Sequence, residues 1–271
     1  MRLNKDTTLC MSLAAKPSNF GTRFHNYLYD ALNLNYVYKA FAPTDLAQAI
    51  AGVRGLPVRG CAISMPYKED VMALVDEMDA SATAIQSVNT IVNTNGVLKA
   101  YNTDYIAIVK IIEKYNISPD TKFALKGSGG MAKAVAFALK NKGFKNGIIV
   151  AKNENAGQAL AQSSGYVWQK ELQDDTVELL INATPVGMAG TAFEQDLAFS
   201  AQDIHAAKII FDVVALPENT PMIQLANLQG KVTIQGSEVF ALQALEQFSL
   251  YTGVYPDQAV FQAAAEFSRA G

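Results

Sequence analysis

The stretch Phe123-Ala-Leu-Lys-Gly-Ser-Gly-Gly-Met-Ala-Lys-Ala134 decides the fold. A short apolar run leads into closely spaced glycines, and a helical pattern follows at once as far as Lys142, so we expect a strand, a tight turn and a helix. Gly127, Gly129 and Ala132 fit the spacing G-x-G-x-x-A, which allows the turn, the approach of a pyrophosphate and close packing of helix on strand. Free N–H groups at the start of that helix favour phosphates. The stretch therefore predicts a dinucleotide site, and a glycine-rich turn without a ligand is the alternative.

Composition limits the classes of protein to consider. The chain has 271 residues, of which 50% are hydrophobic and 17% are charged, and its formal net charge is −3. These values predict a soluble globular protein of one large or two ordinary domains. Without a basic stripe, nucleic acid is not expected as the partner. No apolar run approaches the roughly 20 residues that span a bilayer, so no membrane association is expected either.

Targeting and metal signals are weak. The start of the chain, Met1 to Asp6, is too polar in its flanks for a signal peptide, so a cytoplasmic location is expected. Cys10 and Cys61 each lie in an apolar, strand-like run, which predicts buried thiols. With only two histidines besides, no metal site is expected.

The rest of the chain alternates strand and helix patterns, which predicts an α/β fold with two domains. Before the glycine turn, strands are expected at 7–13, 36–41, 60–65, 87–92 and 97–101, with helices at 23–32, 45–53, 69–74, 81–86 and 105–115. From the turn region onward, strands are expected at 122–126, 147–151, near 166, 177–181, 208–212 and 231–234, with helices at 131–142, 155–164 and 221–228. Two final helices, 236–251 and 257–267, are expected to return to the first domain.

We therefore predict a first domain formed by residues 1–103 and 237–271, which binds substrate. Residues 104–236 are predicted to form a doubly wound, Rossmann-type nucleotide domain.

Polar residues gather at the expected carboxyl ends of the first domain's strands, where sites of α/β proteins lie. They are Ser64, Lys68, Asn89, Asn102 and Asp104. A lysine held by an aspartate can act as a proton donor or, once deprotonated, as a base. Taken singly, the lysine also fits a solvated surface charge, the amide of Asn89 a satisfied core group, and Asp104 a helix-capping carboxylate.

Together these motifs resemble the shikimate dehydrogenase family over nearly the whole chain. The similar segments are 60–69, 87–90, 102–104, 127–133, 181–188, Asp212 with 220–221, and 243–244. The family has two α/β domains with a cleft between them. It oxidises shikimate to 3-dehydroshikimate reversibly, usually with NADP, in aromatic amino acid biosynthesis.

The resemblance implies roles for individual residues. Lys68 would be the catalytic acid or base, with Asp104 as its partner. Substrate contacts would come from Asn19, Thr22, Ser64, Asn89 and Gln243. Cofactor contacts would come from Gly127, Ser128, Gly129, Gly130, Met131, Lys152, Val213 and Glu238. The partners expected are a small hydroxy acid and NADP, in a monomer or a homodimer.

The residues after the second strand of the nucleotide domain bear on the choice of cofactor. No acidic residue closes that strand to bind a ribose 2′-hydroxyl, as an NAD site prefers, and Glu154 lies further on. Lys152 stands where the family's arginine would hold the 2′-phosphate. Because lysine lacks the bidentate fork of arginine, we expect NADP with a looser preference and NAD as a weaker alternative. Without the resemblance, Lys152 fits a solvated loop lysine equally well.

Three positions depart from the family pattern. The Ser-x-Ser-Pro that holds the shikimate carboxylate is replaced by Asn19-Phe-Gly-Thr22. The substrate-binding tyrosine is Ala215, and a glycine expected beside the nicotinamide is Glu238. These changes predict a divergent member with reduced or altered substrate preference.

Several interpretations stay open on the sequence. Shikimate is the first candidate substrate, quinate the second and an amino-substituted shikimate the third. A folate-type dehydrogenase shares the two-domain plan and a cleft lysine, but Asn89 and the segment 102–104 favour the shikimate family. A non-enzymatic alternative is a sensor that binds NADP and a carboxylic metabolite with little turnover.

Overall fold

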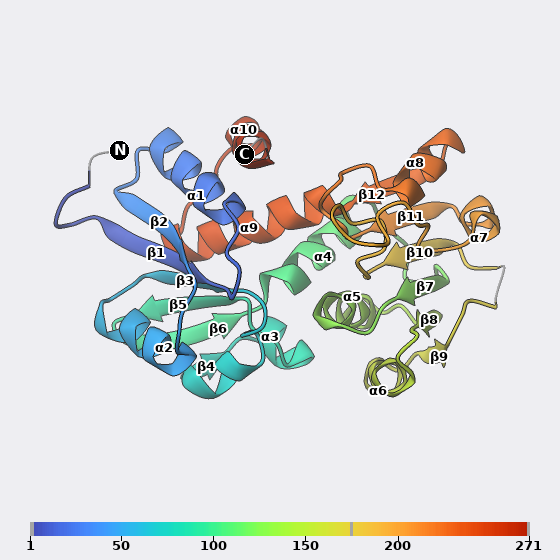
Figure 1. Cartoon of the computed structure of the whole chain (residues 1–271), viewed down its shortest axis with the longest axis horizontal. Coiled ribbons are helices and arrows are strands. Elements are labelled where there is room, and N and C mark those ends of the chain that lie inside the picture. The colour runs from blue at the N-terminus through green and yellow to red at the C-terminus, as the bar shows by residue number, and fades with distance from the viewer. Residues whose placement is uncertain (1–2, 174–175, 270–271) are drawn as a thin grey trace. The chain divides into compact units, whose positions relative to one another are not determined.

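A computed structural model describes residues 3–173 and 176–269 of the chain, so the outermost residues of the predicted first domain, 1–2 and 270–271, lie outside the described part. The chain divides into two compact units (Figure 1). The first comprises Met1–Thr103 and Ala241–Gly271, and the second Asp104–Phe240. The second boundary between the units therefore lies between residues 240 and 241, whereas the sequence predicts it between 236 and 237.

The first unit contains a six-stranded mixed sheet in the order β2-β1-β3-β5-β6-β4. Its strands are β1 (Thr8–Leu13), β2 (Tyr36–Phe41), β3 (Gly60–Ile63), β4 (Glu77–Met78), β5 (Thr90–Thr94) and β6 (Val97–Tyr101). β1 pairs in parallel with β2 and β3, whereas β5 pairs antiparallel with β3 and β6. The β5–β6 hairpin closes at Asn95 and Gly96, both with positive φ, as the Asn-Gly turn signal predicts.

The helices in the N-terminal part of the first unit are α1 (Phe20–Ala31), α2 (Leu46–Gly55), the 3-10 helix η1 (Asp70–Leu74) and α3 (Ala80–Ile85). Two of them, α2 and α3, begin at a capping side chain. The carboxylate of Asp45 accepts a hydrogen bond from the Gln48 amide, and that of Asp79 from the Ser81 amide. Residues 70–74 were expected to be an α-helix and form a 3-10 turn instead, a form usual for such short connectors.

The C-terminal helices complete the core of the first unit, as predicted. They are α9 (Gly236–Thr252) and α10 (Gln258–Arg269), and α10 lies beside α1 (Figure 1). The guanidinium of Arg23 on α1 lies 4.1 Å from the ring centroid of Phe267 and donates to that residue's carbonyl oxygen at 2.6 Å. Phe24 and Phe261 pack edge to face between the same two helices.

The second unit is the predicted doubly wound domain. Its sheet has the order β12-β11-β10-β7-β8-β9, and all its strand pairs are parallel. The strands are β7 (Phe123–Lys126), β8 (Gly147–Val150), β9 (Val167–Gln169), β10 (Leu179–Asn182), β11 (Ile209–Asp212) and β12 (Val232–Gln235). The chain reverses its winding direction between β7 and β10, and the crevice at the carboxyl ends of these two strands is where such sheets bind ligands.

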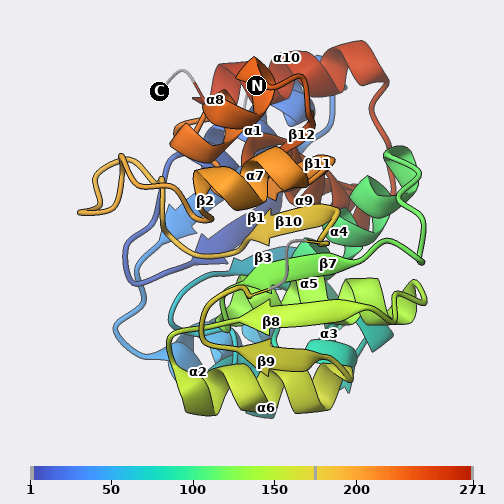
Figure 2. The ribbon, with the colours of Figure 1, turned by 90° about the vertical axis from the view of Figure 1, so that its right-hand side faces the viewer.

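Helices cover both faces of this second sheet. They are α4 (Thr103–Lys114), α5 (Gly130–Asn141), α6 (Glu154–Ser164), α7 (Ala201–Ala206) and α8 (Pro221–Leu228). Figure 2 shows α5 behind β7 and α7 in front of the sheet. α7 and β4 were not predicted from the sequence, because elements of six and two residues are too short to show a period.

Candidate functional site

The glycine turn after β7 has the geometry of a phosphate cradle. Gly127 has a φ of +126°, and a Cβ there would lie 2.8 Å from the carbonyl oxygen of Ala183, so only glycine fits. A Cβ at Gly129 or Gly130 would meet nothing within 4 Å, so the backbone of the turn is open on that side. Gly129 is the N-cap residue of the 12-residue helix α5 and has no side chain to satisfy its first N–H groups. These groups are placed to bind an anion.

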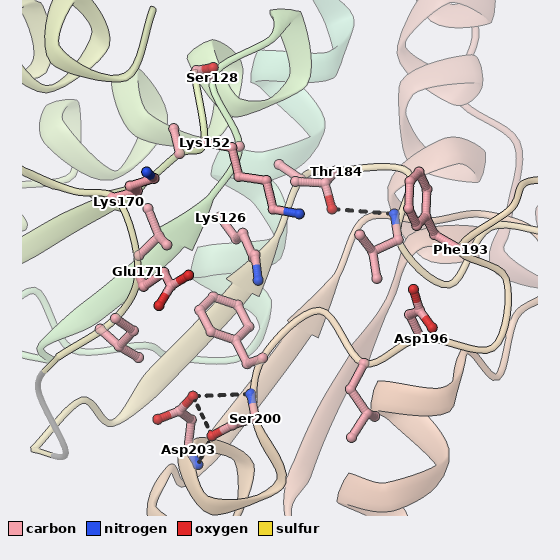
Figure 3. A pocket seen from close by; sticks show the side chains of 18 of the residues that line it. Lys126, Ser128, Lys152, Lys170, Glu171, Thr184, Phe193, Asp196, Ser200 and Asp203 are labelled. Atoms are coloured by element: carbon pink, nitrogen blue, oxygen red, sulfur yellow. Dashed lines mark hydrogen bonds between the residues drawn. The ribbon is translucent and has the colours of Figure 1, made fainter. Parts of the chain in front are cut away.

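A cavity of about 1080 Å³ opens directly on this turn (Figure 3). Its lining comes entirely from the second unit, from segments that follow β7, β8, β9 and β10 and from the chain before and within α7. Gly127, Ser128, Gly129 and Lys152, all predicted to contact a cofactor, lie in this lining. Gly130 and Met131 lie in the first turn of α5, outside it. A cavity of this size and place fits the adenosine half of a dinucleotide.

The loop after β8 presents a cation to the cavity. Lys152 is exposed and lines it (Figure 3), while the next residue, Asn153, caps α6 by accepting from the Ala156 amide at 3.1 Å. Glu154 lies in the first turn of α6 and accepts from the side-chain amide of Gln158, so its carboxylate belongs to the helix surface. The loop therefore offers a positive charge where an NAD site prefers a carboxylate.

A buried carboxylate orders the loops after β10 and β11. One oxygen of Asp212 accepts from the Asn182 side chain and the Val214 amide, each at 3.0 Å. The other accepts from the Thr220 hydroxyl at 2.7 Å, and that hydroxyl also caps α8. Burial raises the pKa of Asp212 to about 6, although these hydrogen bonds oppose the shift. Val213, predicted to contact the cofactor, follows directly on Asp212 and is half-buried.

In the first unit, Asn89 lies at the centre of a buried polar network. Its side-chain oxygen accepts from the Thr103 amide at 2.8 Å, the Thr103 hydroxyl at 3.1 Å and the Thr90 hydroxyl at 2.8 Å. A backbone N–H can only donate, so this atom of Asn89 is the oxygen, and the NH₂ group lies on the other side. The fixed orientation turns the NH₂ group away from Thr103, and its contact with a substrate stays a prediction.

Gln247 supports that network, and sequence reasoning missed it. Its amide nitrogen donates to the Thr90 hydroxyl at 3.0 Å and approaches the Asn89 carbonyl oxygen at 3.3 Å. One turn earlier on α9, the predicted substrate ligand Gln243 has its side-chain oxygen 3.4 Å from the Thr103 hydroxyl. The spacing of four between these two glutamines, which places them on one face of α9, was the available signal.

Lys68 and Ser64 lie in the segment that leaves β3. Ser64 is exposed, and Lys68 is half-buried, with its backbone carbonyl accepting from the Val88 amide at 2.8 Å. Asp104 lies in the first turn of α4 and is 8% exposed. Asn102 instead has a structural role, because its side chain donates to the Ser87 carbonyl oxygen. The acid–base pairing of Lys68 with Asp104 stays a prediction.

The segment 19–22, which stands in place of the family's carboxylate-binding Ser-x-Ser-Pro, forms the start of α1. Asn19 is the N-cap residue but makes no capping hydrogen bond, and Thr22 lies in the first turn. A Cβ at Gly21 would lie 3.3 Å from the hydroxyl oxygen of Tyr38, so the glycine permits a close approach of that ring.

Glu238, predicted to adjoin the cofactor, binds the C-terminal end of α4 and the residue after it. Its carboxylate accepts from Nζ of Lys114 at 2.7 Å and from the Tyr115 hydroxyl at 3.0 Å. Burial, and then this carboxylate, raise the pKa of Tyr115 to about 12. A contact between Glu238 and a cofactor stays a prediction.

Comparisons with known proteins agree with this architecture. The family model for the shikimate dehydrogenase substrate binding domain matches residues 19–91. The chain is 54% identical to the shikimate dehydrogenase-like protein of Haemophilus influenzae over 267 residues, which are 98% of each chain. It is 32% identical to the shikimate dehydrogenase (NADP(+)) of Desulforamulus reducens, over 93% of this chain and 92% of that one.

The chain belongs to the shikimate dehydrogenase family. The resemblance and the fold predicted from the sequence are thereby confirmed.

Solved structures of family members superpose over almost the whole chain. A shikimate 5-dehydrogenase-like protein of 54% identity gives a TM-score of 0.97 and covers 99% of this chain and 100% of its own. The shikimate 5-dehydrogenase of Thermus thermophilus, in complex with NADP(H) and shikimate, gives 0.82 at 25% identity, covering 96% and 99%. The quinate dehydrogenase of Corynebacterium glutamicum, in complex with NAD, gives 0.87 at 25% identity, covering 98% and 99%.

Between residues 3 and 269, apart from 174–175, no group of three or more His, Cys, Asp or Glu side chains is placed to hold a metal ion. In the same part of the chain, no helix is both long and apolar enough to cross a bilayer.

Proposed function

We propose that this protein is an NADP-dependent oxidoreductase that acts on a ring hydroxyl of shikimate or of a closely related cyclic hydroxy acid. The observation that carries the proposal is the juxtaposition, in one cavity, of an open glycine turn at a helix N-terminus and the cation Lys152. The turn supplies donors for a pyrophosphate, and the lysine a charge for a 2′-phosphate.

The first unit supplies the groups expected at the substrate. The NH₂ of Asn89 is oriented by Thr103 and Thr90 to donate to a substrate hydroxyl. Gln243, on the adjoining face of α9, brings a second amide to the same network. Buried donors of this kind discriminate strongly for a hydroxylated ring, because a substrate without the hydroxyl leaves them unpaired.

Lys68 is the proposed acid and base. Bound NADP supplies the hydride acceptor at its nicotinamide. In the oxidative direction the Lys68 amine takes the proton of the reacting hydroxyl, and in the reductive direction its ammonium returns a proton to the developing alkoxide. Asp104 would orient the Lys68 side chain at the reacting hydroxyl, so that the ammonium can act as the donor when the ketone is reduced.

The replaced loop favours an altered carboxylate contact. Gly21 offers no hydroxyl, so Asn19 and Thr22 are left as the donors near the start of α1. With Ala215 in place of the family's tyrosine, this supports a pocket with reduced or shifted preference for shikimate. Quinate and an amino-substituted shikimate are the next substrates to test, and a sensor with little turnover is the non-enzymatic alternative.

The test is hydride transfer by the purified protein. Shikimate, quinate and related hydroxy acids are each supplied with NADP and with NAD, and reduced nicotinamide is followed by absorbance. We expect turnover of at least one compound with NADP, and a loss of ~100-fold or more in kcat for Lys68→Met with a smaller change in KM.

The matched control is Lys39→Met, an exposed lysine of β2. Equal rates for the wild type and Lys68→Met would reject the proposed role of Lys68. Binding of NADP without turnover of any compound would favour the sensor.

A further inference from the structure

Lys126, the last residue of β7, brings a second ammonium group into the cofactor cavity. It stands immediately before Gly127, and neither the sequence pattern nor the cavity's predicted ligands include it. Its Nζ donates to the carbonyl oxygen of Ala198 and lies 5.4 Å from the ring centroid of Phe199. The side chain is half-buried, so its ammonium is held in place by the cavity wall.

Lys126 and Lys152 face the same space. Both line the cavity, and Figure 3 shows the two side chains entering it, Lys126 from the end of β7 and Lys152 from the loop after β8. Burial and the positive charge of Lys152 both lower the pKa of Lys126. Two like charges in one cavity are destabilising until an anion lies between them.

The carboxylates of Glu171 and Asp203 also line the cavity. Glu171 is exposed at the rim, and Asp203 is already engaged with Ser200 in the capping box that begins α7. Asp203 and Glu171 both act to raise the pKa of Lys126, and so oppose the lowering by burial and Lys152. The Lys126 ammonium has three N–H donors, and the carbonyl of Ala198 uses one of them.

We propose that Lys126 binds the 2′-phosphate of the cofactor together with Lys152, and that this pair of lysines sets the preference for NADP over NAD. The inference rests on the proposed function. A single lysine offers a phosphate a point charge without a fork of donors, and the second ammonium supplies the missing contact from another direction. The pyrophosphate is left to the free amides at the start of α5.

The test uses fragments of the cofactor, so that binding is read without turnover. Calorimetry measures the affinity of the full-length protein for 2′,5′-ADP, which carries the 2′-phosphate, and for 5′-ADP, which lacks it. For Lys126→Met we expect 2′,5′-ADP to bind ~10-fold or more weakly, as the loss of one charge-assisted hydrogen bond implies. Affinity for 5′-ADP should change less than ~2-fold, and Lys126→Arg should restore much of the loss.

Lys140→Met is a closely matched control. Lys140 also donates to a backbone carbonyl, that of Ser163, and lies over a phenylalanine ring, 5.6 Å from the centroid of Phe137, but outside the cavity. Lys140→Met should leave the affinities for 2′,5′-ADP and for 5′-ADP unchanged. Lys152→Met should resemble Lys126→Met, and the double variant should bind the two fragments alike.

Two results would overturn the inference. One is unchanged 2′,5′-ADP binding in a folded Lys126→Met protein, and the other is an equal loss for both fragments, which would assign Lys126 to the 5′-phosphates. If the wild type itself does not prefer 2′,5′-ADP to 5′-ADP, the NADP assignment fails as well. If the wild type prefers 2′,5′-ADP, Lys152→Met loses that preference and Lys126→Met retains it, only the proposed role of Lys126 is rejected.

Discussion

The backbone amide of Thr103 donates to the side-chain oxygen of Asn89 at 2.8 Å, and this bond fixes which way the Asn89 amide faces. Asn89 therefore has a structural half, its oxygen, and a proposed binding half, its NH₂ group. The two halves can be separated by substitution.

Asn89→Asp keeps an acceptor for Thr103 and Thr90 but removes the donor. We expect a loss of ~10-fold or more in kcat/KM for the best substrate, with unfolding free energy within about 1 kcal/mol of the wild type. Asn89→Ala removes both halves and leaves the buried Thr103 amide unpaired, which should cost about 1–3 kcal/mol. Urea denaturation and steady-state kinetics measure the two effects. If Asn89→Asp retained full kcat/KM, Asn89 would have no donor role.

Asn19 should contribute to substrate binding and little to stability. It occupies the N-cap position of α1 without making the capping hydrogen bond, so its side chain is not needed to begin the helix. Asn19→Ala should raise KM for a carboxylate substrate while kcat and the thermal midpoint stay nearly unchanged, as expected for uniform binding.

Asp45→Ala is the contrasting control for Asn19→Ala. Asp45 does cap its helix, by accepting from the Gln48 amide at 2.8 Å, so its loss should cost about 1 kcal/mol of stability with KM unchanged. If Asn19→Ala lowered the midpoint as Asp45→Ala does and left KM unchanged, Asn19 would be a structural residue.

The fold was predictable because the glycine turn and the alternation of strand and helix patterns both indicate a doubly wound domain. The stretch around Gly127 specified strand, turn and helix, and the structure adds the reason, since a Cβ there would collide with the backbone at Ala183. The structure also shows Asp45 and Asp79 capping α2 and α3, each through a local side-chain hydrogen bond. Elements of one turn or less, such as α7, show no period and could not be found this way.

The site was predictable only where chemistry is tied to a motif. Lys152 could be placed by its distance from the second strand, but Lys126 reads as an ordinary strand end until the fold brings it to the same cavity. Glu238 has a contact that could not be predicted. Its carboxylate binds Lys114 and Tyr115 across more than a hundred residues, which no local pattern reveals, while the place beside the cofactor that the family pattern suggests stays a prediction.

The Glu238 contact should be visible in the titration of Tyr115. Burial is the main cause of its raised pKa and Glu238 the second, so Glu238→Gln should lower the pKa from about 12 but leave it above the ordinary value. NMR of ring-labelled tyrosine measures this. If Glu238 serves only α4, affinity for NADP should be unchanged in the variant. A clear gain in affinity would instead show that the carboxylate opposes the cofactor.

Acid should destabilise the first unit through His25. This imidazole is fully buried on α1 and stacks on Tyr38 with centroids 4.4 Å apart. Burial lowers its pKa from 6.5 to about 3. The folded state therefore binds the proton less readily than the unfolded chain, and the stability present above pH 6.5 is lost as the pH falls toward 3, at up to about 1.4 kcal/mol per pH unit.

Asp212 works in the opposite sense in the second unit. Its pKa is raised from 3.8 to about 6, so its contribution to stability is fully present below pH 3.8 and is lost as the pH rises through 6. An Asp212→Asn background removes this opposing effect and isolates that of His25.

In that background, urea midpoints at pH 7 and pH 5 should differ clearly with His25 present and much less in His25→Phe. The only other histidine, the exposed His205, is the matched control, because His205→Ala should leave the pH dependence unchanged. An equal pH dependence in His25→Phe and its parent would show that His25 does not titrate in this range, and would assign the acid sensitivity to the carboxylates.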